Sequence, residues 1–190
     1  LIEKHYPDLL PFVAPVLSPM EAHAKRIRAL HAGAAAVFFG PCISKKEEAR
    51  RGALEGALTF EELFAWLERK DLLPKEEAPV AEPRRYCSRF FPTTGGILRT
   101  MERLPSVRYL AVEGVERCMA ALEEIRAGKL TGCFLEMSAC VGSCSGGPAA
   151  APQAREALSA RLRVEETASD GEDFDLSEEM DLSRVLCDRS

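Results

Sequence analysis

The sequence lacks several features that would assign a protein class at once. It has only three histidines among 190 residues, no internal repeat, and no apolar run near the roughly 20 residues that a membrane-spanning helix needs. Its first residues do not form a secretory signal peptide. Acidic residues outnumber basic ones by 30 to 25, and the net charge of −5 does not favour nucleic acid or an anionic membrane as a partner. These absences predict a soluble, cytoplasmic protein.

Cysteine is the residue type that distinguishes this chain from an average globular protein. Hydrophobic residues make up 46% and charged residues 29%, both ordinary values. The length suffices for one domain or two small lobes. Seven cysteines are an odd number in a chain too long to depend on disulfides. In a reducing compartment they are therefore expected to bind metal, to react, or to pack as small apolar side chains, and Cys118 and Cys133 fit the last role.

Apolar periodicity and capping residues predict an α/β fold with small, partly parallel sheets flanked by helices. Ser18 is expected to cap a helix, and Thr59 to open a capping box. The predicted helices cover residues 19–30, 45–51, 60–69, 97–101, 114–127 and 152–163, and the predicted strands cover residues 34–39, 107–112 and 133–136. Residues 74–85 are expected to be a surface loop. We expect residues 1–163 to form one partial domain, followed by an acidic, flexible connector, 164–190, to a further module.

The first cysteine motif, Gly-Pro-Cys-Ile-Ser-Lys-Lys at residues 40–46, directly follows the predicted strand 34–39. Open α/β sheets bind ligands at the carboxyl ends of their strands. Lys45 lies one helical turn beyond Cys42, so its ammonium group can donate to whatever Cys42 binds. A reactive cysteine is an alternative because nearby lysines favour a thiolate. It ranks third, since no histidine adjoins Cys42 to act as its base.

The second motif, residues 136–147, contains a Cys-x-x-x-Cys pair after the predicted strand 133–136. On a helical turn, the sulfurs of Cys140 and Cys144 would face the same way. The adjoining glycines allow close backbone approach and offer N–H groups that offset charge on a metal–sulfur cofactor. The pair is equally half of a zinc site. No second pair completes such a site, however, and the three histidines lack ligand spacing.

Together these motifs resemble the active-site domain of the iron-only (FeFe) hydrogenases. The family pattern Pro-Cys-x-x-Lys-Lys-x-Glu matches residues 41–48, and Phe-Gly-x-(Ser/Thr)-Gly-Gly is similar to residues 91–96. The pattern Glu-x-Met-x-Cys-x-x-Gly-Cys-x-x-Gly-Gly is similar to residues 136–147. The resemblance extends from residue 1 to about 150, with the motifs in the family's order.

The resemblance implies an H-cluster, which is a 4Fe-4S cluster joined through one cysteine to a two-iron subsite carrying CO, cyanide and a bridging dithiolate amine. Cys42, Cys140 and Cys144 are then three of the four cubane ligands, and Cys144 is shared with the two-iron subsite. The fourth ligand belongs to a Thr-Ser-Cys-Cys-Pro-like motif that we expect just upstream of Leu1. The site of this chain by itself is therefore expected to be incomplete and inactive.

The resemblance also implies roles around the metal. Lys45 hydrogen-bonds a cyanide, because a compact ammonium group suits a compact anion. Glu48 is a structural partner nearby, and Phe91 belongs to the apolar wall. The remaining cofactor-binding candidates are Gly40, Pro41, Gly95, Gly96 and Ser138. The implied substrates are H2 and protons, and the implied partners are electron-transfer iron–sulfur modules of ferredoxin type.

Two departures from the family pattern bear on function. Gly40 and Ser138 stand where the catalytic enzymes have methionines that would contact the two-iron subsite, and Met137 is one position off. A hydroxyl in place of a thioether changes redox tuning and proton access, so Ser138 joins Lys45 as a catalytic candidate. These changes resemble sensory hydrogenases of anaerobic cells, which are often followed by iron–sulfur and PAS-type signalling modules. The prediction is reversible H2 chemistry used for H2 or redox sensing; the alternatives are a non-catalytic 4Fe-4S relative and a zinc-binding module.

Overall fold

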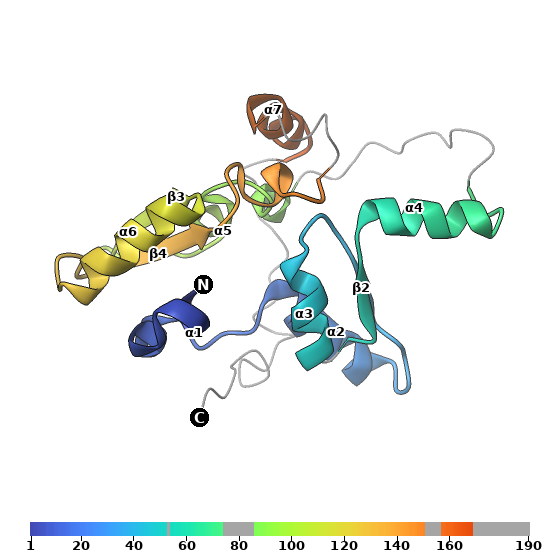
Figure 1. Ribbon diagram of the computed structural model, residues 1–190, viewed down its shortest axis with the longest axis horizontal. Coiled ribbons are helices and arrows are strands. Elements are labelled where there is room, and N and C mark those ends of the chain that lie inside the picture. The colour runs from blue at the N-terminus through green and yellow to red at the C-terminus, as the bar shows by residue number, and fades with distance from the viewer. Residues whose placement is uncertain (53, 74–85, 151–156, 169–190) are drawn as a thin grey trace. The chain divides into compact units, whose positions relative to one another are not determined.

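The structure is a computed structural model that describes residues 1–52, 54–73, 86–150 and 157–168 (Figure 1). The chain folds as two compact units. The described part of the first unit comprises residues 1–13, 86–150 and 157–168, and that of the second comprises residues 14–52 and 54–73. In these ranges no helix has the length and apolar composition to cross a membrane. The predicted loop 74–85 lies outside the described residues.

The second unit is a parallel β–α–β unit between two further helices. Its elements are helix α2 (Pro19–Leu30), strand β1 (Val37–Phe39), helix α3 (Ser44–Arg51), strand β2 (Gly56–Leu58) and helix α4 (Phe60–Arg69). Both predicted caps are present. The Ser18 hydroxyl accepts the N–H of Glu21 at 3.3 Å, and Thr59 and Glu62 each accept the other's backbone N–H. β1 and β2 pair in parallel, which places the residues after β1 at the carboxyl edge of the sheet.

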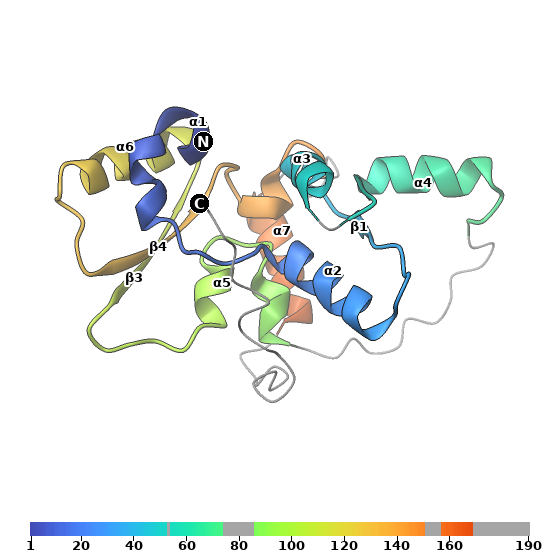
Figure 2. The same cartoon turned by 90° about the horizontal axis from the view of Figure 1, so that it is seen from below.

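The first unit contains another parallel β–α–β unit. Its elements are helix α1 (Ile2–His5), the 3-10 helices η1 (Pro7–Phe12) and η2 (Cys87–Phe90), helix α5 (Gly96–Arg99), strand β3 (Arg108–Glu113), helix α6 (Val115–Arg126), strand β4 (Cys133–Ser138), the 3-10 helix η3 (Ser143–Gly146) and helix α7 (Ala157–Thr167). β3 and β4 pair in parallel over their full lengths, from Arg108 opposite Cys133 to Glu113 opposite Ser138. Helix α6 covers one face of this sheet (Figure 2). The predicted α/β class with small parallel sheets is confirmed.

The predicted end of the domain at residue 163 falls inside α7, which continues to Thr167. Residues 1–163 include parts of both compact units, and the domain 1–163 stays a prediction. Residues 152–156 of the predicted last helix, and residues 169–190 of the predicted connector, lie outside the described residues.

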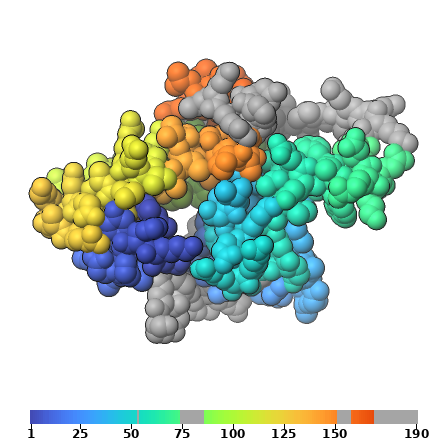
Figure 3. Space-filling view, in the orientation of Figure 1, coloured from blue at the N-terminus to red at the C-terminus, as the bar shows by residue number. Residues whose placement is uncertain are grey.

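A small apolar core joins the N-terminal segment to α6. Tyr6 and Leu9 are 4% exposed and Leu122 is 1% exposed, and Met137 of β4 packs against this cluster. Figure 3 shows the N-terminal residues lying directly on the surface of α6. Neighbouring residues of a strand face opposite sides of the sheet. Met137 therefore lies on the core face, and Ser138 lies on the other.

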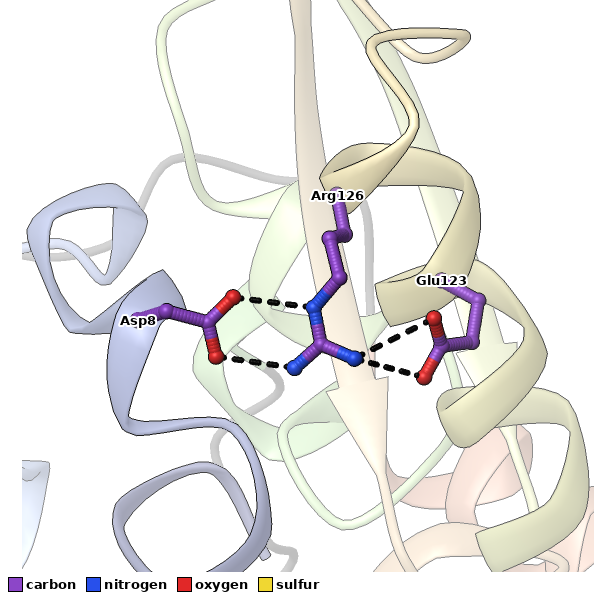
Figure 4. A network of polar contacts seen from close by, with 3 residues as sticks. All are labelled: Asp8, Glu123 and Arg126. Atoms are coloured by element: carbon purple, nitrogen blue, oxygen red, sulfur yellow. Dashed lines mark hydrogen bonds and ion pairs between the residues drawn. The ribbon is translucent and has the colours of Figure 1, made fainter.

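Arg126 reinforces this core from the surface (Figure 4). Its guanidinium donates to both carboxylate oxygens of Asp8, at 2.9 and 2.8 Å, and to Glu123 at 3.0 Å. The hydrogen bonds from Arg126 are the main reason that the pKa of Asp8 lies below its usual value. The contact links η1 to α6 across 118 positions of sequence.

Replacing Arg126 with glutamine is expected to raise the pKa of Asp8 toward the ordinary aspartate value of about 4. Because the folded-state pKa is depressed, the contact contributes to stability above that ordinary value. The contribution is lost as the pH falls through the lower, folded-state pKa. An NMR titration of the Asp8 carboxyl carbon measures the change. Arg117→Gln on the same helix is the control, and an unchanged Asp8 titration in the Arg126 variant would refute the assignment.

Candidate functional site

Each of the two cysteine motifs follows a strand end, as the sequence predicts, and the two motifs belong to different units. Cys42 comes three residues after β1, and Cys140 comes two residues after β4. The six described cysteines are thiols rather than disulfides; Cys42 and Cys140 are half-buried and Cys144 is exposed. Cys118 is buried, as predicted, whereas Cys133 is only half-buried. Cys187 lies outside the described residues.

The backbone before Cys42 is closely packed. The N–H of Gly40 donates to Leu58 at 3.1 Å and so extends the pairing of β1 with β2. A Cβ atom added at Gly40 would lie 2.6 Å from the Phe38 ring. A methionine at this position would therefore require the Phe38 ring to move, which gives a physical reason for glycine here. Pro41 beside it is half-buried.

Lys45 is held by Glu48 at the first turn of α3. Its ammonium group forms an ion pair with Glu48, and these two side chains are 24% and 28% exposed. The other oxygen of Glu48 accepts the hydroxyl of Ser18, the cap of α2. Glu48 thus fixes the lysine after Cys42 to the start of a second helix. Lys46 instead pairs with Glu62 of α4.

The Cys140–Cys144 segment is a turn and not the continuous helix that the four-residue spacing suggests. Gly142 has a left-handed backbone, with φ of 77°, and Ser143 also has a positive φ of 56°. The N–H of Ser143 donates to the carbonyl of Cys140 at 3.1 Å, and η3 begins at Ser143. Glycine adopts such a backbone without strain, whereas serine does so at some cost. This reversal sets the local direction of the chain between the two thiols.

Glu136 connects β4 to the Phe91–Gly96 motif. It is 8% exposed, and its two oxygens accept the N–H groups of Gly95 at 2.9 Å and Leu98 at 3.1 Å. The carboxylate thereby satisfies donors at the start of the short helix α5. The N–H of Gly96 donates to Thr93, also within the protein. Both predicted cofactor-binding glycines therefore use their amides inside the fold, beside a half-buried Phe91.

The cysteine loop, residues 139–147, contacts the Phe91–Gly96 motif directly. Ser145 donates twice to the backbone carbonyl of Pro92, through its N–H at 3.2 Å and through its side-chain hydroxyl at 3.3 Å. Glu113 at the end of β3 accepts the N–H of Gly142 at 3.0 Å and the hydroxyl of Thr94. Within the first unit, the structure therefore brings together two of the three predicted motifs.

Sequence reasoning missed the role of Glu113. The available signal was its position, since the last residues of β3 and β4 meet at one edge of a parallel sheet. Glu113 is opposite Ser138 in the register. Its partners, Thr94 and Gly142, are 19 and 29 residues away in sequence, so no local pattern reveals the contact.

Ser138 and Ser143 form a hydroxyl pair beside the cysteines. Their Oγ atoms are 3.0 Å apart, and Ser143 is only 5% exposed. The backbone carbonyl of Ser138 also accepts the thiol of Cys118 at 3.5 Å. The Ser138 hydroxyl lies where the family pattern has a methionine thioether, and it has the Ser143 hydroxyl as its hydrogen-bond partner.

The thiols suit an iron–sulfur group by their chemistry. They are soft sulfur ligands on loops in which glycine lets the backbone approach closely. A Cβ atom added at Gly146 would lie 1.9 Å from the carbonyl oxygen of Val141. Across the described ranges, no three His, Cys, Asp or Glu side chains gather as a metal-ion site. Neither described unit by itself therefore completes an iron–sulfur or a zinc centre.

Comparisons with known proteins concern the family and the fold of this chain. Residues 1–148 match the model of the family described as iron only hydrogenase large subunit, C-terminal domain. No curated protein matches. A chain solved in work on oxygen inactivation of FeFe-hydrogenase, through modification and degradation of the H cluster 2Fe subcluster, has a similar fold, with a TM-score of 0.56 at 16% identity. The match covers 88% of this chain and 64% of that one.

Proposed function

This chain belongs to the family of iron-only hydrogenase large subunits, whose C-terminal domain it matches over residues 1–148, and we propose that it binds an H-cluster and senses H2 or redox state through reversible H2 chemistry. The observation that carries the proposal is the placement of the cysteine motifs. In a chain of this family, each motif follows a strand of a parallel β–α–β unit at its carboxyl end.

We assign the metal ligands to Cys42, Cys140 and Cys144. When bound, an H-cluster supplies the centre at which protons are reduced and H2 is oxidised. The chain supplies thiolates on glycine-containing loops that allow close backbone approach, and the half-buried Phe91 to limit water. Electron transfer would involve an iron–sulfur module, and a PAS-type partner and a cytoplasmic location remain predictions of the sequence.

Lys45 is proposed to hold a positive charge beside the metal. An ammonium group has three donors, and the structure shows Glu48 as one acceptor. We propose that the remaining donors orient a compact anion such as a cyanide ligand. Glu48 restricts the lysine to one position, which lowers the entropic cost of such a contact.

The residues at positions 40 and 138 are the reason for proposing H2 or redox sensing and not rapid turnover of H2. Gly40 lies under the Phe38 ring, and the Ser138 hydroxyl bonds to Ser143, so neither position offers a thioether. The same observation favours a second candidate function, a non-catalytic relative that assembles a 4Fe-4S cluster only. A zinc-binding module is the third candidate.

Anaerobic reconstitution tests the proposal. The chain is extended upstream of Leu1 by the Thr-Ser-Cys-Cys-Pro-like motif, loaded with iron and sulfide, and then treated with a synthetic two-iron precursor. The expected result is a 4Fe-4S cluster together with infrared bands of bound CO and cyanide. A cluster without those bands would support the cubane-only candidate, and a protein that retains only zinc would overturn both.

Lys45→Ala is expected to reduce binding of the two-iron unit at least about tenfold while leaving 4Fe-4S content near the unsubstituted level. The reason is that a charge-assisted hydrogen bond to the anion is lost, at a cost of about 1.5–3 kcal/mol. The infrared CO and cyanide intensities per 4Fe-4S cluster measure the effect. Lys46→Ala is the matched control, because Lys46 pairs with Glu62 of α4. Equal losses in both variants would contradict the role of Lys45.

A further inference from the structure

We propose that Glu113 is a positioning residue that fixes the turn between Cys140 and Cys144 and keeps the reduction potential of a bound cluster low. The inference rests on the proposed function. Glu113 belongs to none of the three sequence motifs. The motifs also do not specify the reduction potential of a bound cluster.

The geometric part of the inference comes from two hydrogen bonds to one atom. Oε2 of Glu113 accepts the N–H of Gly142 at 3.0 Å and also the hydroxyl of Thr94. Gly142 is the left-handed residue at which the cysteine loop reverses. Glu113 itself is fixed at the last register position of the β3–β4 pair, opposite Ser138. A rigid strand end therefore determines where this reversal lies relative to the Phe91–Gly96 motif.

The electrostatic part follows from the same contact. Hydrogen bonds to cluster sulfur and nearby positive charge stabilise the reduced, more negative form of an iron–sulfur cluster. The N–H of Gly142 donates to the Glu113 carboxylate, so this amide does not donate to a cluster sulfur. It also places a carboxylate within one hydrogen bond of the loop that carries two thiolates. Both effects disfavour reduction and lower the potential.

Other charges nearby do not remove this effect. Glu113 lines a pocket of about 380 Å³ together with Arg117 and Arg161. Arg117 is exposed, and Arg161 is 56% exposed and paired with Glu165. Solvent screens exposed charges strongly. Glu113, by contrast, is half-buried and bonds directly to the cysteine loop.

Two substitutions at Glu113 separate the effect of its hydrogen bond to Gly142 from the effect of its negative charge. Glu113→Gln keeps an oxygen that accepts from Gly142 and removes the charge, whereas Glu113→Ala removes both. In the protein without metal, the amide exchange of Gly142 is expected to accelerate about tenfold or more in the alanine variant and to stay near the unsubstituted rate in the glutamine variant. In the reconstituted protein, the midpoint potential is expected to become more positive in both variants, and more so in the alanine variant. Glu116→Gln, the same charge change on an exposed residue of α6, is the control.

The outcomes are distinguishable from failure of the proposed function. If the unsubstituted protein binds no cluster, the proposed function fails, and the Gly142 exchange rates still test the positioning role. If a cluster forms and Glu113→Gln shifts the potential no more than Glu116→Gln, the redox role is wrong. Unchanged Gly142 exchange in Glu113→Ala would overturn the positioning role.

Discussion

Replacing Cys144 with serine is expected to remove most of the iron that the reconstituted protein retains after gel filtration. Cys144 is exposed, so the substitution leaves the core intact and its effect reports metal binding. A serine hydroxyl is a harder and far less acidic ligand than a thiol, and it binds cluster iron more weakly than a thiolate does. If Cys144 is also the ligand shared with the two-iron subsite, the CO and cyanide bands should disappear completely.

Iron and sulfide per chain, measured alongside circular dichroism, decide this prediction. Cys133→Ser is the matched control, since Cys133 is a half-buried thiol at the opposite end of β4. It should retain the full iron content with an unchanged spectrum. Iron retained by Cys144→Ser at the level of this control would remove Cys144 from the ligand set, and equal losses in both variants would point to a fold effect.

Local sequence signals determined much of the fold. Ser18 and the Thr59–Glu62 capping box mark helix starts through contacts over three residues, which a sequence displays directly. The alternation of apolar strands with an amphipathic helix predicted the parallel β3–α6–β4 unit, and the structure confirms it. The resemblance to iron-only hydrogenases rests on three spaced motifs, and the family match confirms it; the sensory subgroup stays a prediction.

The missed features depend on contacts between distant residues. Strand β2 is the three residues Gly56–Leu58, which have no β-branched side chain and form a strand only because β1 pairs with them. The bonds of Glu136 to Gly95 and Leu98 span about 40 positions. The turn at Gly142 and Ser143 replaces the predicted helical turn because both residues adopt positive φ. Spacing between cysteines does not encode that backbone choice.

Ser138→Met is expected to destabilise the protein by about 1–3 kcal/mol, because it leaves the buried Ser143 hydroxyl without its partner. The pattern that residues 136–147 resemble has methionine at position 138 and glycine at position 143. Ser143→Gly removes the orphaned hydroxyl and suits the positive φ of 56°. A left-handed residue other than glycine costs roughly 1–2 kcal/mol. Relative to Ser138→Met, the double variant is therefore expected to recover the roughly 1–3 kcal/mol lost with the orphaned hydroxyl and, in addition, the roughly 1–2 kcal/mol of backbone strain.

Urea unfolding of the four proteins gives the coupling free energy between positions 138 and 143. Ser138→Ala, which removes the hydroxyl without adding bulk, separates the lost hydrogen bond from crowding by methionine. Additivity within about 0.5 kcal/mol would show that the two serines act independently. A clear coupling free energy would mean that the stabilising effect of Ser138 depends on the presence of Ser143. The hydroxyl at 138 then has to be tested in the Ser138→Met/Ser143→Gly background, where a change in the cluster's spectrum reflects the lost hydroxyl and not a damaged cysteine loop.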